Sequence, residues 1–187
     1  MSDLVLAGLC GSLRAASTNR LLLSEAVRRF GPATFEAGDL DLPIYNGDVE
    51  DAGIPAKVQA LSDLVGRADA VIVCTPEYNK GISGVLKNAL DWISRTEGNP
   101  WRDKPVALMS AAAGAAGGER AQNMARLCLT PFRPYLLPGP EVFVRQTGSK
   151  WTDDGRLNDA QAAKLVDDLM GQLRSVADAR RIARAPA

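Results

Sequence analysis

The sequence predicts an α/β fold with an open parallel sheet, and two observations lead to this prediction. First, residues 4–10, 70–74 and 106–109 are continuous apolar runs without polar alternation. Such runs are typical of strands that helices cover on both faces. Second, amphipathic helical patterns separate the strands, so that strands and helices alternate along the chain. Strict alternation favours a parallel sheet between two layers of helices.

The predicted elements follow the order β-α-β-α-β-α-β-α-β-α. Two weaker strand candidates, residues 34–40 and 141–144, have mixed polarity and lie beside Pro or Gly, which suits edge strands. Helices are indicated where apolar residues recur with a period of about 3.6. These apolar stripes are Leu23, Ala26, Val27 and Phe30; Val58, Leu61, Val65 and Ala68; Leu86, Ala89, Leu90 and Ile93; Ala121, Met124, Ala125 and Cys128; and Ala162, Leu165, Val166, Leu169, Leu173 and Val176.

Length and composition limit the class of protein. A chain of 187 residues without internal repeats is expected to form a single domain, residues 1–187. Basic and acidic residues number 22 each, so the formal charge is zero, which argues against a nucleic-acid-binding domain with a basic face. The sequence contains no histidine. This excludes histidine-dependent hydrolases and histidine-ligated zinc, so any chemistry must use a cofactor, backbone groups or other side chains.

The sequence gives no sign of membrane insertion or export. No stretch approaches the roughly 20 apolar residues that a membrane helix needs. The chain enters its first apolar run without a basic region or a cleavage site, so we expect a cytoplasmic protein. Cys10, Cys74 and Cys128 are odd in number and far apart, which argues against a disulfide framework and against a metal site of the CxxC type.

An open α/β sheet binds its ligand beyond the carboxyl ends of its strands, which directs attention to three loops. The first, residues 11–19, contains Ser, Thr, Asn and one Arg and precedes a helix. Helix amides, hydroxyl groups and an arginine are typical of a phosphate site. The loop lacks the lysine of a P-loop and the third glycine of a dinucleotide fingerprint. The alternative is a helix cap that satisfies its own amides.

The second loop, residues 75–84, offers backbone groups to the edge of a flat heterocycle. Pro76 fixes the exit from the strand, and Gly81 allows close approach of the backbone. Tyr78 would form a wall or a lid. The alternative is an ordinary turn in which Ser83 caps the next helix.

The third loop, residues 110–122, is rich in Gly and Ala and has little bulk to pack. A planar ring lying against this backbone would fill the space. The alternative is a flexible loop in solvent.

Together these segments resemble the NADPH-dependent FMN reductase family, whose members reduce flavins, quinones, azo compounds or chromate. The residues that carry the resemblance lie at 11–19, 76–92, 114–122 and 154–157, in the expected order, within a region from about residue 4 to 175. The sequence Pro-Glu-Tyr-Asn at 76–79 is the most specific piece.

The resemblance implies a flavodoxin-like three-layer sandwich whose five-stranded parallel sheet has the order 2-1-3-4-5. It implies FMN as the cofactor, with phosphate contacts from the first loop and ring contacts from the other two. Because the third loop is so rich in alanine, its contacts are expected to come from the backbone. The expected cofactor-binding residues are Gly11, Ser12, Leu13, Arg14, Ser17, Asn19, Pro76, Glu77, Tyr78, Asn79, Gly81, Ser110, Ala111, Gly114 and Gly117.

The implied activity is ping-pong transfer from NADPH or NADH, through FMN, to a small-molecule acceptor such as a flavin or quinone. The flavin carries the chemistry, so no catalytic side chain and no metal are expected. Two alternatives remain open. One is a flavodoxin-type electron-transfer module, although such proteins tend to be acidic and to lack the Pro-Glu-Tyr-Asn loop. The other is a response-regulator-like signalling domain, which needs clustered Asp residues at its strand ends.

Two further expectations concern cysteines and assembly. Cys10 and Cys74 would end neighbouring strands, where a redox pair is conceivable but buried free thiols are the commoner state. The resemblance implies a homodimer or homotetramer, and the apolar aromatics Trp92 and Trp101 and the stretch 132–138 suit an interface. The alternative for Trp92 is simple core packing.

Overall fold

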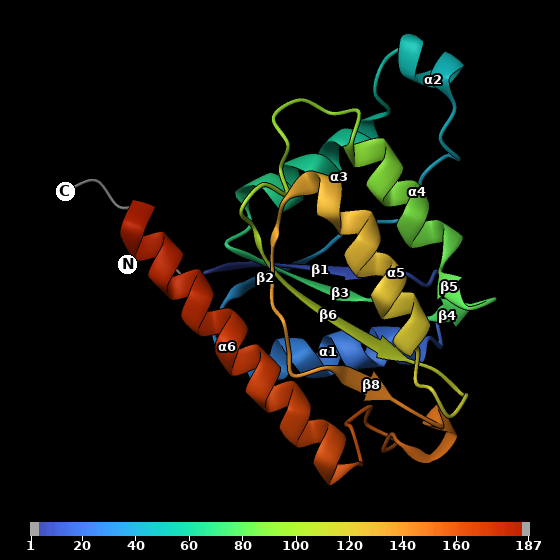
Figure 1. Cartoon of the computed structure of the whole chain (residues 1–187), viewed down its shortest axis with the longest axis vertical. Coiled ribbons are helices and arrows are strands. Elements are labelled where there is room, and N and C mark those ends of the chain that lie inside the picture. Colours follow the sequence, from blue (N-terminus) through green and yellow to red (C-terminus); the bar gives the residue numbers. More distant parts are fainter. Residues whose placement is uncertain (1–3, 185–187) are drawn as a thin grey trace.

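The computed structural model describes residues 4–184 and contains a parallel sheet between two layers of helices (Figure 1). The sheet has the order β2-β1-β3-β6, and β6 pairs on its outer side with both β7 and β8. The expected order 2-1-3-4-5 is confirmed, with β7 and β8 sharing the fifth place. The strands are β1 (Val5–Cys10), β2 (Thr34–Ala37), β3 (Ala70–Cys74), β6 (Pro105–Ala111), β7 (Tyr135–Leu136) and β8 (Val142–Val144).

The fifth place is divided because the chain between β7 and β8 is rich in proline. Pro138 and Pro140 lack the N–H that a ladder needs, so regular pairing stops after Leu137 donates to Val106 O. The sequence predicted only the second piece, residues 141–144. It also predicted a longer edge strand at 34–40, whereas β2 ends at Ala37 and only the Gly38 amide continues the pairing, to Gly8 O.

The helices form the two outer layers. On one face lie α1 (Thr18–Phe30) and α6 (Ala160–Arg184); on the other lie α3 (Ala56–Arg67), α4 (Gly84–Ile93) and α5 (Glu119–Leu129). Each of the five predicted apolar stripes lies on one of these helices, except that Ala68, the last residue of the second stripe, follows the end of α3. A short helix, α2 (Gly47–Asp51), lies between β2 and α3. Two 3-10 turns follow other elements: η1 (Thr130–Phe132) follows α5, and η2 (Thr147–Ser149) follows β8.

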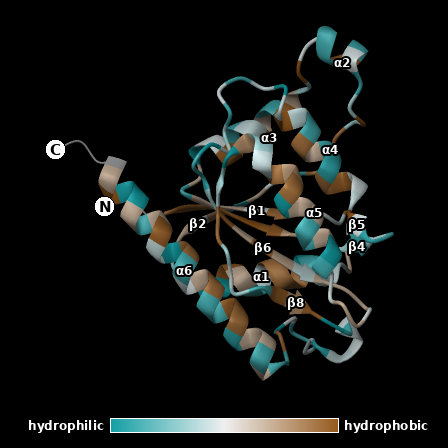
Figure 2. Ribbon diagram, in the orientation of Figure 1, coloured by the Kyte–Doolittle hydropathy of each residue, from teal (hydrophilic) through white to brown (hydrophobic). Residues whose placement is uncertain are grey.

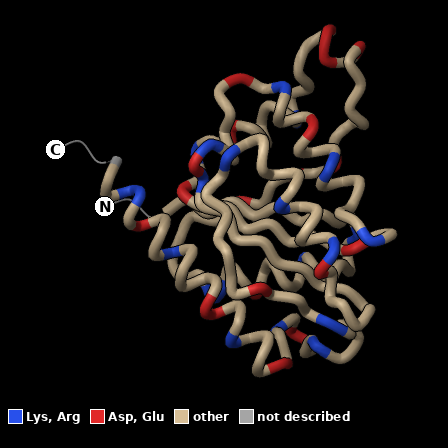
Figure 3. The backbone as a smooth tube through the Cα atoms, in the orientation of Figure 1, with Lys and Arg blue, Asp and Glu red and all other residues tan. Residues whose placement is uncertain are grey.

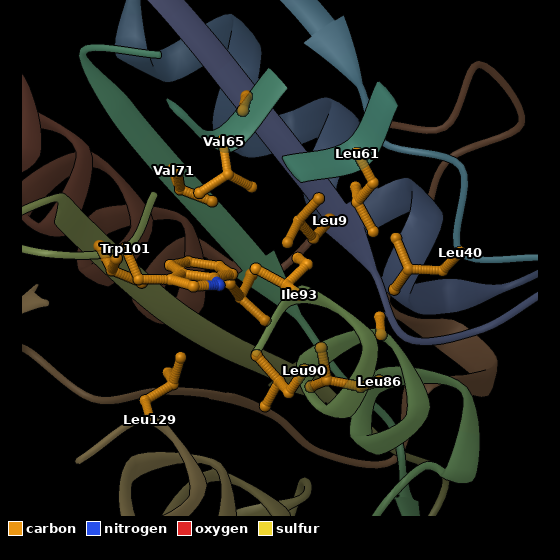
Figure 4. Close-up of a cluster of buried hydrophobic side chains, with 14 of the residues drawn as sticks. Leu9, Leu40, Leu61, Val65, Val71, Leu86, Leu90, Ile93, Trp101 and Leu129 are labelled. Atoms are coloured by element: carbon orange, nitrogen blue, oxygen red, sulfur yellow. The ribbon is translucent and has the colours of Figure 1, made fainter. Parts of the chain in front are cut away.

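Each face of the sheet has its own apolar core. Leu22, Leu173 and Ile72 belong to the core on the α1 and α6 face, and Val65 and Leu90 to the core on the opposite face. Figure 4 shows the second core, where Trp101 lies among leucine and valine side chains from several elements. In Figure 2 the strands and the sheet-facing sides of the helices are the most hydrophobic parts. The central strands thereby hold the loops at their carboxyl ends on a rigid base.

The two tryptophans that suggested an interface belong to this core. Trp92 and Trp101 are fully buried within the chain. Trp92 Nε1 donates to Pro43 O at 2.7 Å, and Tyr45 packs edge-on against its ring. Core packing, the alternative stated for Trp92, is therefore the observed one, and these aromatics provide no reason to expect self-association.

The surface shows no segregation of charge along the backbone. Basic and acidic residues are interspersed over the described part of the chain (Figure 3). Within residues 4–184, no helix is both long enough and apolar enough to cross a membrane.

Candidate functional site

The three predicted loops meet around one cavity of about 460 Å³ at the carboxyl edge of the sheet. A volume of this size is within the range of small-molecule sites. The cavity is lined by Ser12, Arg14, Ala16, Ser17, Thr18, Asn19, Pro76, Glu77, Tyr78, Ala111, Ala112, Ala113, Gly114, Ala116, Gly117, Gly118 and Thr147. Ten of the fifteen residues expected from the sequence are therefore brought together.

The amino end of α1 opens into this cavity with unused hydrogen-bond donors. Ser17 occupies the N-cap position but makes no side-chain capping bond in the described structure. No acidic residue lies in the first helical turn, which begins at Thr18. The helix dipole and the first amides therefore favour an anion here, and Arg14 adds a positive charge to the lining. The self-satisfied cap considered from the sequence does not form.

Asn19 has a structural task in this site. Its Nδ2 donates to Ala111 O at 2.8 Å, and its Oδ1 accepts from Ala111 N at 2.9 Å. This two-point bond ties the start of α1 to the end of β6. The side-chain amide, which the resemblance implied for phosphate binding, is engaged with the backbone, so we expect Asn19 to offer a ligand its main-chain N–H.

The loop after β3 contains a hairpin that the sequence did not predict. β4 (Glu77–Tyr78) pairs with β5 (Gly81–Ile82) across the two-residue turn Asn79–Lys80. Both turn residues have positive φ, 49° and 66°, as a tight I′-type hairpin requires. The hairpin carries Tyr78 at the cavity with 52% of its surface exposed, which suits the expected wall or lid.

Glu77 connects this hairpin to the start of α5. One carboxylate oxygen accepts from Arg120 N at 3.1 Å, and the other lies 3.5 Å from the Arg120 guanidinium. The carboxylate thus satisfies a first-turn amide of α5, whose own N-cap, Gly118, has no side chain. Glu77 lines the cavity, but its charge is directed to the helix.

The loop after β6 has an exposed tip, residues 113–115, and a buried end that packs on the strand. Gly117 and Gly118 have φ values of 64° and 94°, which favour glycine. A Cβ on Gly118 would lie 2.6 Å from Ser110 Cβ, so the loop lies directly on the strand end. The Ser110 hydroxyl donates to Gly117 O and accepts from Gln122, and Gln146 N donates to Gly114 O.

Five of the expected residues lie outside the cavity lining. Gly11 is buried against Ser83 and Thr75, and its amide donates to Cys74 O. Ser110 is fully buried and bonds to the loop backbone as described above. The remaining three are the exposed Leu13 and the hairpin residues Asn79 and Gly81, of which Gly81 packs against Met124.

The structure adds one lining residue that none of the three loops contains. Thr147 is buried and lies in η2, three residues beyond the end of β8. The same strand-end rule that selected the other loops could have pointed to it, because it follows the fifth strand directly.

The cysteines give no support to a redox pair. Cys10 and Cys74 are paired in register across β1 and β3, but both are free. Burial raises the pKa of the Cys10 thiol and raises the pKa of Cys74 well above its ordinary value. Little thiolate is then present near neutral pH: the Cys10 thiol donates to Ser12 O, and Cys74 packs in the apolar core.

The site suits a ligand that is flat at one end and anionic at the other. The uncapped start of α1 and Arg14 suit the anion, and small residues and backbone groups from 111–118 suit a flat ring. Among the described residues, no cluster of three or more His, Cys, Asp or Glu side chains is placed to hold a metal ion.

Comparison with known proteins agrees with this geometry. The sequence profile of the NADPH-dependent FMN reductase family matches residues 5–148. An NAD(P)H-dependent FMN reductase of Pseudomonas aeruginosa is 37% identical over 174 residues, which cover 92% of this chain and 94% of the relative. A quinone reductase of Escherichia coli K12 is 35% identical over 170 residues, covering 88% and 89%.

Solved structures show the same relationship. The flavoenzyme NAD(P)H:(acceptor) oxidoreductase FerB of Paracoccus denitrificans superposes with a TM-score of 0.84 at 30% identity, covering 93% of this chain and 97% of FerB. A WrbA-like flavodoxin of Agrobacterium tumefaciens superposes with a TM-score of 0.58 at 18% identity, over 93% and 99% of the two chains, and supports the fold alone. Because the family profile spans most of the chain and relatives above 30% identity cover nearly all of it, the chain belongs to the NADPH-dependent FMN reductase family.

Proposed function

We propose that this protein is an FMN-dependent oxidoreductase that oxidises NAD(P)H and reduces a small acceptor such as a quinone or a flavin. The family and the named activities of its relatives support the reaction class. The observation that carries the proposal is the amino end of α1, which opens uncapped into a cavity with small-residue walls. A flavin with a single phosphate matches this combination of an anion site and a flat slot.

The residues assigned to FMN follow from their positions. Arg14, Ser17 and the first amides of α1 would bind the phosphate, because they surround the open helix end. Pro76 and the backbone of residues 111–114 would line the ring. When bound, the flavin supplies the hydride and electron chemistry. The protein then needs to bind, orient and shield, which agrees with a chain that contains no histidine.

Both substrates are proposed to use the same cavity in turn. The three loops are already assigned to the phosphate, the ring edge and the ring floor, and the sequence lacks a Gly-rich dinucleotide fingerprint. Tyr78 is half exposed on its hairpin, so it is placed to form one side of the remaining opening. One opening admits one planar partner at a time, so the oxidised donor must leave before the acceptor enters.

Steady-state kinetics with the FMN-loaded protein test this proposal. We expect parallel lines in double-reciprocal plots, and each substrate in excess should inhibit competitively against the other. NADPH should also bleach the yellow protein when oxygen is absent. Intersecting lines would show that donor and acceptor bind together. A yellow protein that NADPH fails to bleach would instead be an electron-transfer module of the flavodoxin type.

The proposal includes two broader properties. The free thiols of Cys10, Cys74 and Cys128 support a reducing, cytoplasmic location. Self-association as a homodimer or homotetramer is proposed from the family resemblance, with the half-exposed Tyr135 of the stretch 132–138 as an apolar surface residue. A monomeric mass in light scattering at micromolar concentration would contradict the second property.

A further inference from the structure

A second cavity adjoins the first at the end of β8. Its volume is about 620 Å³, and it lies between β8, the loop that follows it and the start of α6. It is lined by Pro140, Glu141, Phe143, Val144, Arg145, Gln146, Lys150, Asp159, Gln161, Ala162 and Leu165. None of these residues is used by the site assigned to FMN.

Arg145 stands on the boundary between the two cavities. Its side-chain stem lies against Gly117, because a Cβ on that glycine would be 2.7 Å from Arg145 Cγ. Gly117 lines the first cavity, whereas Arg145 lines the second. The next residue, Gln146, donates its amide to Gly114 O of the first cavity, and Thr147 then lines that cavity itself. The Arg145 side chain therefore separates the two cavities at this point.

The charge of Arg145 is not neutralised by the protein. Within residues 4–184, its exposed side chain forms no ion pair or hydrogen bond. Glu141 precedes β8 and Arg145 follows it; the three strand residues between them keep the two side chains about 13 Å apart along the chain. Lys150 and Asp159 pair with each other at 2.5 Å. A positive charge therefore remains at the end of the second cavity that meets the first.

We propose that Arg145 binds a phosphate group of the nicotinamide dinucleotide donor, and this inference rests on the proposed function. A nicotinamide that reaches the first cavity must leave its adenosine half and phosphates outside it, and the adjoining cavity provides the space. Dinucleotide sites commonly bind the pyrophosphate with a Gly-rich helix start, which the sequence lacks. An arginine fork is the other common phosphate-binding device in proteins.

The test compares three reduced donors on the Arg145→Gln variant: NADPH, NADH and dihydronicotinamide riboside, which has no phosphate. The KM for NADPH should rise about tenfold, as the loss of a charge-assisted hydrogen bond predicts, while the KM for the riboside stays unchanged. An equal rise for NADH places Arg145 on the pyrophosphate, and a rise for NADPH alone places it on the 2′-phosphate. High salt should reduce the difference between wild type and variant.

Titration calorimetry on the FMN-loaded protein gives a readout that does not depend on turnover. Arg145→Gln should weaken binding of ADP-ribose or its 2′-phosphate derivative about tenfold, and Arg145→Lys should restore part of the affinity. Arg102→Gln is the matched control. Arg102 is exposed and precedes β6, so it lies at the amino-terminal end of the strands, opposite the cavities. This substitution removes the same charge and should leave all three KM values unchanged.

Three results would overturn the inference. Unchanged KM values for both dinucleotides would show that Arg145 meets no donor phosphate. An equal rise for all three donors would assign it to the nicotinamide end or to a structural role. Weaker binding of FMN, with riboflavin unaffected, would assign it to the flavin phosphate. If the wild type oxidises no donor, the proposed function fails, and the calorimetry still decides the role of Arg145.

Discussion

The helices α1 and α5 both begin at the carboxyl edge of the sheet, but their amino ends are treated differently. At α5 the protein supplies its own anions: Glu119 lies in the first turn, and the Glu77 carboxylate accepts from the Arg120 amide. At α1 the described structure has no acidic residue in the first turn and no side-chain cap from Ser17. One helix end is closed by the protein, and the other is left for a ligand.

A third helix completes the comparison. The start of α4 is closed by Ser83, whose hydroxyl accepts from Leu86 N at 3.1 Å. Among the three helices whose first residues adjoin the cavity loops, α1 is thus the exception; α3 also begins without a side-chain cap or an acidic first-turn residue, but it does not line the cavity. Unsatisfied helix amides lower stability unless a partner is provided, so an uncapped end beside a cavity identifies the place where the anionic part of a ligand binds.

The largest effect is expected when α1 is made to resemble α5. Thr18→Glu places a carboxylate in the first turn of α1, beside the proposed phosphate position. Two like charges about 4 Å apart in a site of effective dielectric constant near 20 repel by roughly 4 kcal/mol. FMN affinity should fall about 1000-fold, while riboflavin affinity changes less than about threefold. Equilibrium titrations monitored by flavin fluorescence measure both.

Thr18→Gln is the control for this variant, because it has the same shape without the charge. It should bind FMN nearly as well as the wild type. The unliganded Thr18→Glu protein should be slightly more stable than the wild type, by about 0.5 kcal/mol, since an acidic residue favours a helix start. Equal losses of FMN and riboflavin affinity would show that the phosphate binds elsewhere.

A smaller effect is expected when the positive charge beside α1 is removed. Arg14 is exposed and lines the cavity, so Arg14→Ala should lower FMN affinity about tenfold through loss of a charge-assisted hydrogen bond. Riboflavin has no phosphate, and its affinity should change little. Arg20→Ala serves as the control, because Arg20 is exposed on α1 but does not line the cavity. Equal losses for both flavins would remove Arg14 from the phosphate site.

The central part of the fold could be predicted from the sequence because its signals are local. Helices cover both faces of the sheet, so β1, β3 and β6 are continuous apolar runs, and each covering helix has a periodic apolar stripe. Both patterns can be read in the sequence of each segment alone. The edge of the sheet was harder to predict from the sequence. β7 is two residues long and half exposed, so pairing with β6 determines it and no local pattern does.

The site could be predicted at the level of loops but less well at the level of side chains. Loop positions follow from the strand order, whereas the direction of a side chain depends on contacts distant in sequence. Asn19 is bonded to Ala111, 92 residues away, and Glu77 to Arg120, 43 residues away. These partners determine which groups remain available for a ligand, and they become visible only once the strands are placed side by side.

The smallest effect is expected when α5 is made to resemble α1. Glu77→Ala removes the acceptor for the Arg120 amide and opens the start of α5. Loss of a helix cap costs about 1 kcal/mol, which should lower the melting temperature by about 3 °C in a chain of this size. FMN affinity should change less than about threefold, because the carboxylate is directed to the helix. Glu77→Gln, which keeps an acceptor oxygen, should lose less stability than Glu77→Ala. The comparison between the two helix ends would fail if Glu77→Ala weakened FMN binding tenfold at an unchanged melting temperature, since the carboxylate would then face the ligand.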